Sequence, residues 1–167
     1  MAIYLFRLDH RPGRDKRVTT HLFLAGRALG ADKAFYSGLR DVNVEKSVSE
    51  VVKSWGGSFS VEFVDNWKRF IKNFNGIRIH LTMYGLPVQD VVKKINVKED
   101  VLIIVGGSKV PSFIFDVSEY NVSVTSQPHS EISSLALFLR ELNPNCYDLK
   151  FGGKEILPSE RGKVFKN

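Results

Sequence analysis

The chain is short of the residues that build disulfide or metal frameworks. Its 167 residues include one cysteine, Cys146, so an internal disulfide cannot form and a cysteine-based structural zinc site is excluded. The four histidines show no HxxxH or HExxH spacing, so we expect no metal site; they are His10, His21, His80 and His129. A single cysteine fits a reducing compartment, and we expect a cytoplasmic protein.

Long apolar runs and nucleotide-binding glycine motifs are also missing. No apolar stretch approaches the roughly 20 residues of a membrane span, and MAIYLFRLDHR becomes charged too early for a secretory signal. The segment GGSKVP, 106–111, lacks the second glycine and the GK[ST] ending of a P-loop, and it is not a GxGxxG motif. We therefore expect no membrane partner, no NAD site and no nucleoside triphosphate site.

Positive charge is concentrated near the two ends of the chain. The net charge is +6; residues 1–17 and residues 150–167 each hold five basic and two acidic residues, while 18–149 is balanced. If the ends meet, within one chain or across a dimer, they form one basic patch suited to a polyanion. The alternative is a pair of solvated, solubilising ends.

Strand and helix patterns alternate almost throughout. We expect strands at 2–8, 33–36, 58–63, 77–83, 101–105 and 121–124, and helices at 20–29, 44–55, 65–74, 88–95, 111–117 and 132–142. Such alternation predicts an α/β fold, with a mostly parallel sheet and helices on both faces. The apolar run VLIIV, Val101–Val105, predicts a strand buried on both faces.

The chain is most simply one domain, 1–146, followed by a C-terminal extension, 147–167, that belongs to the same unit. KFGGKEILP in this extension predicts a β-hairpin that turns at Gly152-Gly153. The first predicted helix has Thr19 or Thr20 as its N-cap and Gly30 as its stop.

Three polar loops follow three of the predicted strands: MYGLP, GGSKVP and TSQPHSE. Because parallel strands bring their carboxyl ends to one edge of a sheet, these loops are expected to line a pocket for a small, partly polar ligand. Spacing alone leaves TSQPHSE equally compatible with an ordinary strand-to-helix turn. His129 lies in this loop, whereas His80 in IRIHLTM is expected to be a hydrogen-bonded core residue.

The segment HRPGRDKRVTTH, 10–21, is the densest charged cluster and is predicted to precede the first helix. Four cations within seven residues repel one another unless an anion lies nearby, and phosphate suits the guanidinium fork. We therefore favour nucleic acid as the partner. The alternative is a solvated loop with Asp9 and Asp15 as its counterions.

Four segments, HRPGRDKRVTTH, HLTMYG, VLIIVGGSKVP and SQPHSEISSLALFL, occur in this order within residues 1–142. In sequence and spacing they resemble the archaeal tRNA 2′-O-methyltransferases that act on cytidine 56 of the T-loop, within the SPOUT superfamily. The resemblance implies a C-terminal trefoil knot, a homodimer, S-adenosyl-L-methionine bound among the knot loops, and methyl transfer to a ribose 2′-hydroxyl of tRNA without a metal.

The resemblance also implies site residues. The implied cofactor-binding residues are Leu81, Gly106, Gly107, Ser108, Lys109, Val110, Val124, Thr125, Ser126, Gln127, Pro128, His129, Ser130 and Glu131. The implied catalytic residue is Arg17, with Arg14 and Arg11 as phosphate-binding or positioning residues. Arg27 stays an alternative, although its apolar helix LFLAGRALG favours a structural pairing role.

One position departs from the family pattern. Many relatives carry an acidic residue where Ser108 stands; if that carboxylate orients substrate or cofactor, Glu131 or the serine hydroxyl must compensate here. Two other functions remain open: another SPOUT RNA methyltransferase, and a non-catalytic RNA-binding protein of the same fold, which only Ser108 favours.

Overall fold

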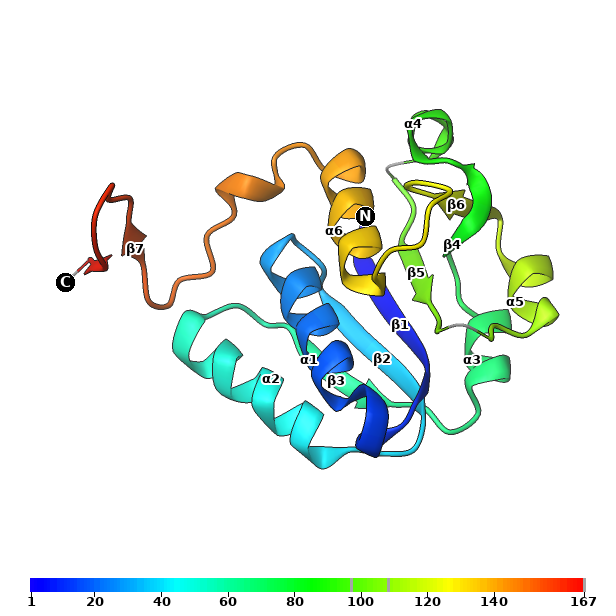
Figure 1. Ribbon diagram of the computed structural model, residues 1–167, viewed down its shortest axis with the longest axis horizontal. Helices are drawn as coiled ribbons and strands as arrows, with labels where there is room; N and C mark the ends of the chain where they lie inside the picture. The colour runs from blue at the N-terminus through cyan, green and yellow to red at the C-terminus, as the bar shows by residue number, and fades with distance from the viewer. Residues whose placement is uncertain (97, 108, 167) are drawn as a thin grey trace.

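The computed structural model describes residues 1–96, 98–107 and 109–166, and it contains a six-stranded parallel sheet (Figure 1). The strands lie in the order β3-β2-β1-β5-β4-β6, and all their pairs are parallel. Their bounds are β1 (Ile3–His10), β2 (Lys33–Gly38), β3 (Ser60–Phe63), β4 (Ile77–Pro87), β5 (Val101–Val105) and β6 (Tyr120–Ser123). The predicted fold class, a parallel α/β sheet, is confirmed, while the trefoil knot stays a prediction.

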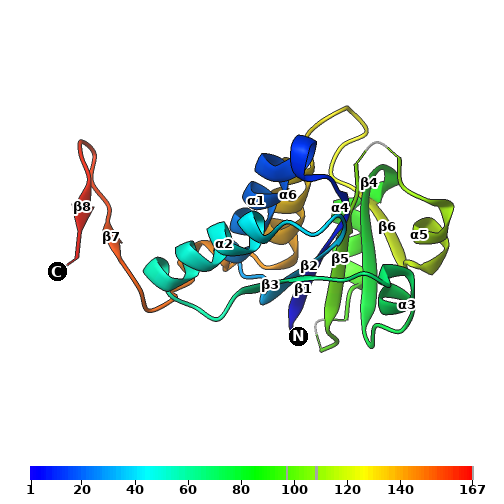
Figure 2. The same cartoon turned by 90° about the horizontal axis from the view of Figure 1, so that it is seen from below.

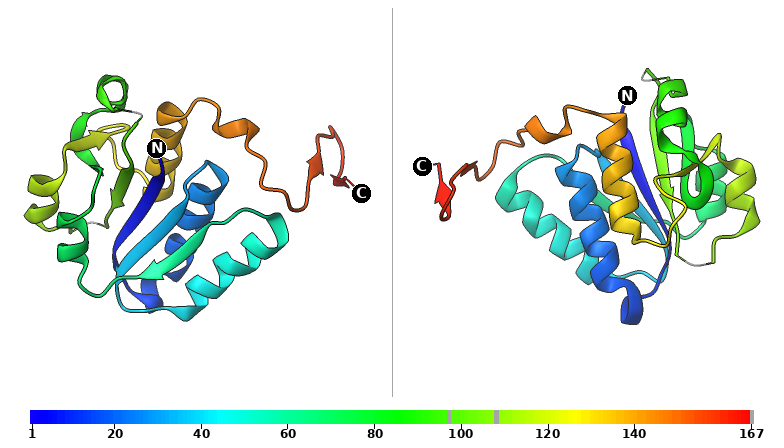
Figure 3. Two further views of the ribbon diagram at one scale, coloured as in Figure 1. Left: turned by 180° about the vertical axis from the view of Figure 1, so that it is seen from behind. Right: turned by 45° about the horizontal axis from the view of Figure 1, so that its top comes forward.

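Helices cover both faces of the sheet. Figure 2 shows α1, α2 and α6 on one face and α3 and α5 on the other. Helices α1 and α6 pack side by side (Figure 3). The bounds are α1 (Pro12–Ala28), α2 (Val42–Trp55), α3 (Trp67–Lys72), α4 (Val88–Val91), α5 (Ser112–Val117) and α6 (Glu131–Leu142), with 3₁₀ turns η1 (Val92–Lys94) and η2 (Cys146–Asp148).

Two apolar layers hold these helices to the sheet. Because strand side chains alternate between faces, Leu5 of β1 packs in the layer under α1 and α6, while Phe6 packs in the layer under α3 and α5. Every residue of β5 is buried, as the run VLIIV predicted. Each fully buried Leu, Ile or Phe side chain stabilises the fold by about 1.5–3 kcal/mol.

Helix α1 starts earlier than its apolar pattern indicated. Its first residue is Pro12, not Thr20, so the predicted N-cap at Thr19 or Thr20 is wrong. Proline suits the first helical position because it has no N–H to satisfy, and the Asp15 carboxylate accepts the backbone N–H of Arg11 at 3.2 Å. The basic segment is therefore helical from Pro12 onward. Gly30, with φ 97°, follows the helix end as predicted.

Strand β4 also differs from its prediction. It extends to Pro87, and residues 82–85 form an irregularity because both Leu81 and Leu86 pair with Val122 of β6. MYGLP is therefore not a free loop after the strand. The helix predicted over 88–95 is the short α4 continued by the η1 turn.

The tail forms the predicted β-hairpin, but the predicted turn is wrong. Strand β7 (Ile156–Leu157) pairs with β8 (Val164–Phe165), so residues 158–163 make the turn. Gly152 instead forms an antiparallel bridge with Gly56. A Cβ on Gly56, whose φ is 82°, would lie 2.2 Å from the carbonyl oxygen of Phe151, so these glycines permit close backbone approach rather than a turn.

The basic ends do not meet within one chain. Figure 1 shows the tail projecting away from the sheet, beyond the C-terminal end of α2. The first turn of α1 lies at the opposite end of the pair formed by α1 and α2. The two basic segments are separate surfaces of the monomer.

Candidate functional site

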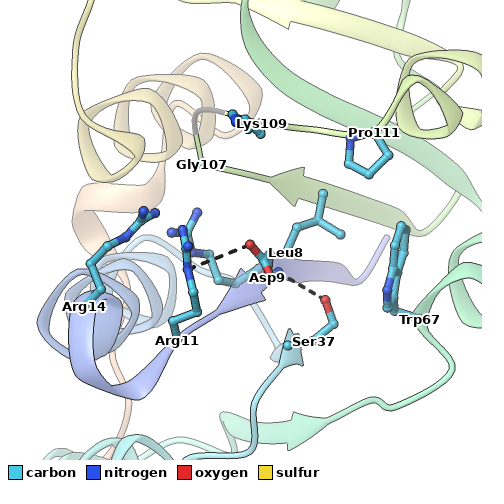
Figure 4. A pocket seen from close by; sticks show the side chains of 11 residues that line it. Leu8, Asp9, Arg11, Arg14, Ser37, Trp67, Gly107, Lys109 and Pro111 are labelled. Carbon is cyan, nitrogen blue, oxygen red and sulfur yellow. Dashed lines mark hydrogen bonds and ion pairs between the residues drawn. The ribbon is translucent and has the colours of Figure 1, made fainter.

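A cavity of about 440 Å³ lies at the carboxyl ends of β1, β2 and β5 (Figure 4). Connections from β1 and β5 leave toward opposite sides of the sheet, which is where open α/β sheets bind ligands. The walls of the cavity come from five segments of the chain. The lining residues are Arg7, Leu8, Asp9, Arg11, Arg14, Ser37, Gly38, Trp67, Gly107, Lys109 and Pro111.

Asp15 holds two guanidinium groups at one wall of this cavity. Arg14 Nε donates to Asp15 Oδ1 at 3.0 Å, and Arg11 Nε lies 3.6 Å from Asp15 Oδ2. Burial by itself would raise the pKa of Asp15, but hydrogen bonds from the Arg14 side chain and the Arg11 backbone lower that pKa on balance. Both ion pairs use Nε, which leaves the terminal nitrogens of the two guanidinium groups available to an anion.

Arg14 also reaches the loop after β5. Its Nη2 atom lies 3.8 Å from the position that a Cβ on Gly107 would occupy. The basic start of α1 and the glycine loop of β5 are therefore neighbours across the cavity, although they are about ninety residues apart in the sequence.

Arg7 is the buried cation of the cavity. Its side chain is 2% exposed, and Nη1 lies 3.6 Å from Oε1 of Glu131 at the start of α6. Within the described part of the chain, its Nε and Nη1 have no hydrogen-bond partner. A buried guanidinium with free donors is costly unless an acceptor arrives. Sequence reasoning missed this residue, although a cation on the apolar face of Ile3 and Leu5 was a visible signal.

Asp9 and Gly38 shape the floor where β1 and β2 end. Asp9 has φ 51°, and among the described residues it is the one non-glycine with positive φ. Its backbone N–H donates to Ser37 Oγ at 3.2 Å. Gly38 has φ 102°, and a Cβ there would lie 2.4 Å from the carbonyl oxygen of His10. Strained backbone at a cavity is typical of functional sites.

A buried network fixes the segment that carries these arginines. His10 is fully buried; its Nδ1 lies 2.9 Å from Thr19 Oγ1 and its Nε2 lies 3.3 Å from Asp41 Oδ2. Burial would raise the pKa of Asp41, but hydrogen bonds from His10 and from the Asn43 backbone lower it on balance. The network joins the end of β1, Thr19 of α1 and the N-cap of α2, so α1 is tied to both of its neighbours.

The implied cofactor residues gather at the neighbouring strand ends. Leu81 pairs with Val105 of β5 and with Val122 of β6. A Cβ on Gly106 would lie 2.3 Å from Val110 Cγ2, so Val110 packs directly over the glycine. Gly107 and Lys109 line the cavity. Ser108 lies outside the described residues, and nothing is assigned to it.

The loop between β6 and α6 supplies the other implied cofactor residues. Val124 and Glu131 are partly buried, and the residues between them are exposed: Thr125, Ser126, Gln127, Pro128, His129 and Ser130. Ser130 caps α6 by accepting the backbone N–H of Ser133 at 3.2 Å. At the start of the loop, Ser123 Oγ is buried, and it has no hydrogen-bond partner within the described residues.

These features fit a cofactor with adenine, ribose and amino acid parts. Exposed loop backbone provides donors and acceptors for the adenine, and the unpaired Ser123 hydroxyl offers a further buried polar contact. Leu81, Val110 and Val124 supply apolar surface beside them. The site therefore has both kinds of contact that such a molecule needs.

Some of the implied residues are not brought to the cavity. Arg17 is exposed on α1 and is not among the lining residues. His129 Nδ1 lies 3.0 Å from the carbonyl oxygen of its neighbour Ser130. Arg27 donates to the Gly56 carbonyl at 2.6 Å and stacks on Phe151 at 4.5 Å, which confirms its structural role. His80 is a fully buried core residue bonded to Asn121 at 2.9 Å, as predicted.

Two further findings concern the described residues only. No group of three or more His, Cys, Asp or Glu side chains is placed to hold a metal ion among residues 1–96, 98–107 and 109–166. Over the same ranges, no helix has the length and apolar character needed to cross a membrane.

The sequence comparisons all point to the same family. The family model described as "tRNA ribose 2'-O-methyltransferase, aTrm56" matches residues 55–166. A tRNA (cytidine(56)-2'-O)-methyltransferase of Pyrococcus horikoshii is 46% identical over 96% of this chain and 83% of its own length. The protein of that name from Archaeoglobus fulgidus is 42% identical, covering 98% of this chain and 97% of its own.

Comparisons of structure agree on the fold. A crystal structure of an RNA 2'-O ribose methyltransferase matches with a TM-score of 0.63 at 19% identity, over 84% of this chain and 55% of that chain. The SpoU methyltransferase AviRb from Streptomyces viridochromogenes, solved with AdoMet, matches with a TM-score of 0.58 at 15% identity, over 85% and 56%. At these identities the likeness concerns the fold.

Proposed function

Because the chain belongs to the aTrm56 family of tRNA ribose 2′-O-methyltransferases, we propose that it methylates the ribose 2′-hydroxyl of cytidine 56 in the tRNA T-loop. S-adenosyl-L-methionine is the methyl donor. The observation that carries the proposal is the basic cavity directly beside the implied cofactor loops, with Gly107 and Lys109 shared between the two. A donor and an anionic acceptor then bind side by side.

The cofactor is proposed to lie among the strand-end loops. Its sulfonium carries the transferable methyl group. The exposed backbone of Thr125–Ser130 and the glycine loop at Gly106 bind its polar parts, and Leu81 packs against its apolar surface. This proposal retains all fourteen implied cofactor residues, with Ser108 resting on the family resemblance alone.

The arginines are proposed to bind and orient the RNA. Arg11 and Arg14 hold a phosphate beside the reacting ribose through their free fork nitrogens. Arginine does not normally lose its proton, so its contribution is to stabilise negative charge that develops on the 2′-oxygen. Arg17 keeps the catalytic role that the family resemblance implies.

Arg7 is proposed to join the two halves of the site. Its buried guanidinium lies between the cavity and Glu131, which ends the cofactor loop. An incoming ribose or phosphate oxygen would satisfy its free donors. Substrate binding at the cavity is thereby linked to the position of the loop that holds the cofactor.

We further propose a cytoplasmic homodimer. The support for a dimer is the apolar surface left exposed on the tail and on α6: Leu137, Ile156, Leu157, Val164 and Phe165 are 43–60% exposed. The support for the compartment is the single free cysteine, Cys146. A trefoil knot in residues around the cofactor loops belongs to the same proposal.

The test is methyl transfer to defined tRNA. The protein is incubated with labelled S-adenosyl-L-methionine and a tRNA transcript, and the labelled nucleoside is then located. We expect label on the ribose of cytidine 56. A matched transcript with 2′-deoxycytidine at that position should accept none, and equal labelling of both transcripts would contradict the proposal.

A further inference from the structure

Trp67 forms the wall of the cavity that faces the arginines. Figure 4 shows Arg11 and Arg14 on one side and the indole ring of Trp67 on the other. Trp67 begins α3 on the opposite face of the sheet from α1. The two walls are therefore brought together only by the fold.

The indole ring of Trp67 is held by neighbouring side chains but is not fully buried in the core. It packs against Phe113 of α5 in an edge-on arrangement, with ring centroids 6.1 Å apart at 69°. Lys68 Nζ lies 5.6 Å from the ring centroid. Trp67 is only partly buried, in contrast to the fully buried Ile71 one turn later, so part of the aromatic surface remains for a ligand.

The two walls match the two ends of a nucleotide. Guanidinium forks bind phosphate oxygens, and an indole face binds a nucleobase by stacking. Leu8 and Pro111 provide apolar surface near the ring. The volume of about 440 Å³ is in the range of small-molecule sites. A base held there cannot also be stacked within an RNA helix.

We propose that the cavity takes one RNA nucleotide turned out of its stack, with its base on Trp67 and its phosphate on Arg11 and Arg14. The inference rests on the proposed function, because that function makes RNA the ligand. It adds a base-binding residue and a conformational requirement on the RNA. Enzymes that do chemistry on a base commonly extrude that nucleotide in this way.

Fluorescence of Trp67 tests the stacking directly. The chain has two tryptophans, and Trp55 lines a different cavity near the tail with Phe151 and Lys154. The variant Trp55→Phe therefore reports on Trp67 alone, and the variant Trp67→Phe reports on Trp55 alone. Each is titrated with a T-loop RNA hairpin, and binding is followed independently by anisotropy of a label on the RNA.

We expect the hairpin to quench most of the Trp67 emission and to leave the Trp55 emission nearly unchanged. A hairpin with an abasic ribose at the target position should bind without comparable quenching. The inference is overturned if bound hairpin leaves Trp67 emission unchanged, or if the abasic hairpin quenches it equally.

The affinity of the RNA provides a second measurement. Loss of one base–aromatic stack weakens binding by about five- to 150-fold, so Trp67→Ala should lower hairpin affinity by that factor while Trp67→Phe retains most of it. Equal affinity of Trp67→Ala and parent for the intact hairpin would contradict the inference. If Trp67→Ala fails to fold, the fluorescence titration of the two phenylalanine variants still decides.

These readouts separate the inference from the proposed function. Quenching requires binding but no methyl transfer, so quenching without labelling of cytidine 56 would refute the proposed reaction and retain the base site. Labelling without quenching would retain the reaction and refute the base site.

Discussion

Arg7 Nη1 and Glu131 Oε1 lie 3.6 Å apart, which joins the end of β1 to the first residue of α6. The two side chains differ in exposure, 2% for Arg7 and 31% for Glu131. The buried cation thus depends on a carboxylate that solvent and ligands still reach. A molecule that binds at the cavity or at the cofactor loop therefore changes the surroundings of this ion pair.

Replacing Glu131 by Gln tests the pair. The amide keeps the shape but removes the charge that faces buried Arg7, and we expect the free energy of unfolding to fall by about 1–2 kcal/mol, less than for a fully buried pair. Urea denaturation followed by circular dichroism measures it. Glu141→Gln, at the exposed far end of α6, should change stability by under about 0.5 kcal/mol; equal losses in both variants would rule out the pairing.

Arg14→Ala should weaken tRNA binding and flatten its salt dependence. If Arg14 contacts one phosphate, the slope of log affinity against log salt concentration should decrease by about 0.7–0.9. Filter binding at several salt concentrations measures this slope. Lys46→Ala, on the exposed surface of α2, is the control and should retain the parent slope.

Arg17→Ala distinguishes catalysis from binding. We expect turnover to be lost while the affinity for S-adenosyl-L-methionine, measured by calorimetry, stays within about twofold, because Arg17 is exposed on α1 and is not one of the implied cofactor-binding residues. Parent-like turnover would remove Arg17 from the catalytic role and leave Arg7, Arg11 and Arg14 as the candidates.

Asp9→Gly should preserve or raise stability. Asp9 has φ 51°, a conformation that costs a non-glycine residue about 1 kcal/mol, and its carboxylate lies 3.9 Å from Arg11 Nε with 71% of the side chain exposed. Loss of so weak an ion pair is offset by relief of strain. Thermal unfolding measures the balance, and a clear decrease in Tm would show that the Asp9 side chain stabilises the turn.

Acid should destabilise the start of α1. The pKa of Asp15 and that of Asp41 are lowered in the folded chain, so each carboxylate stabilises the fold above its unfolded pKa of about 4. This stabilisation is lost as the pH falls below about 4 and through the folded pKa. Urea denaturation between pH 3 and pH 6 should show the decline, and Asp15→Asn should show a shallower one.

Local pattern was a good guide where one face of an element is buried. The strand predicted over 2–8, the run Val101–Val105 and the stripe of α6 all formed as expected, since their apolar residues meet the core. It failed at the start of α1, where the first turn around Arg11 faces solvent and the cavity and carries no apolar stripe. Pro12 and Asp15 were the signals that marked this helix start.

The sequence by itself determined the family and the parallel α/β sheet, because these follow from motifs and from periodicities of a few residues. Only the tertiary structure determined which residues line the cavity. It places Arg7, Trp67 and Gly107 around one space, from a strand, a helix on the opposite face and a distant loop. Such neighbours are fixed by strand order and packing between faces, which no local pattern of residues contains.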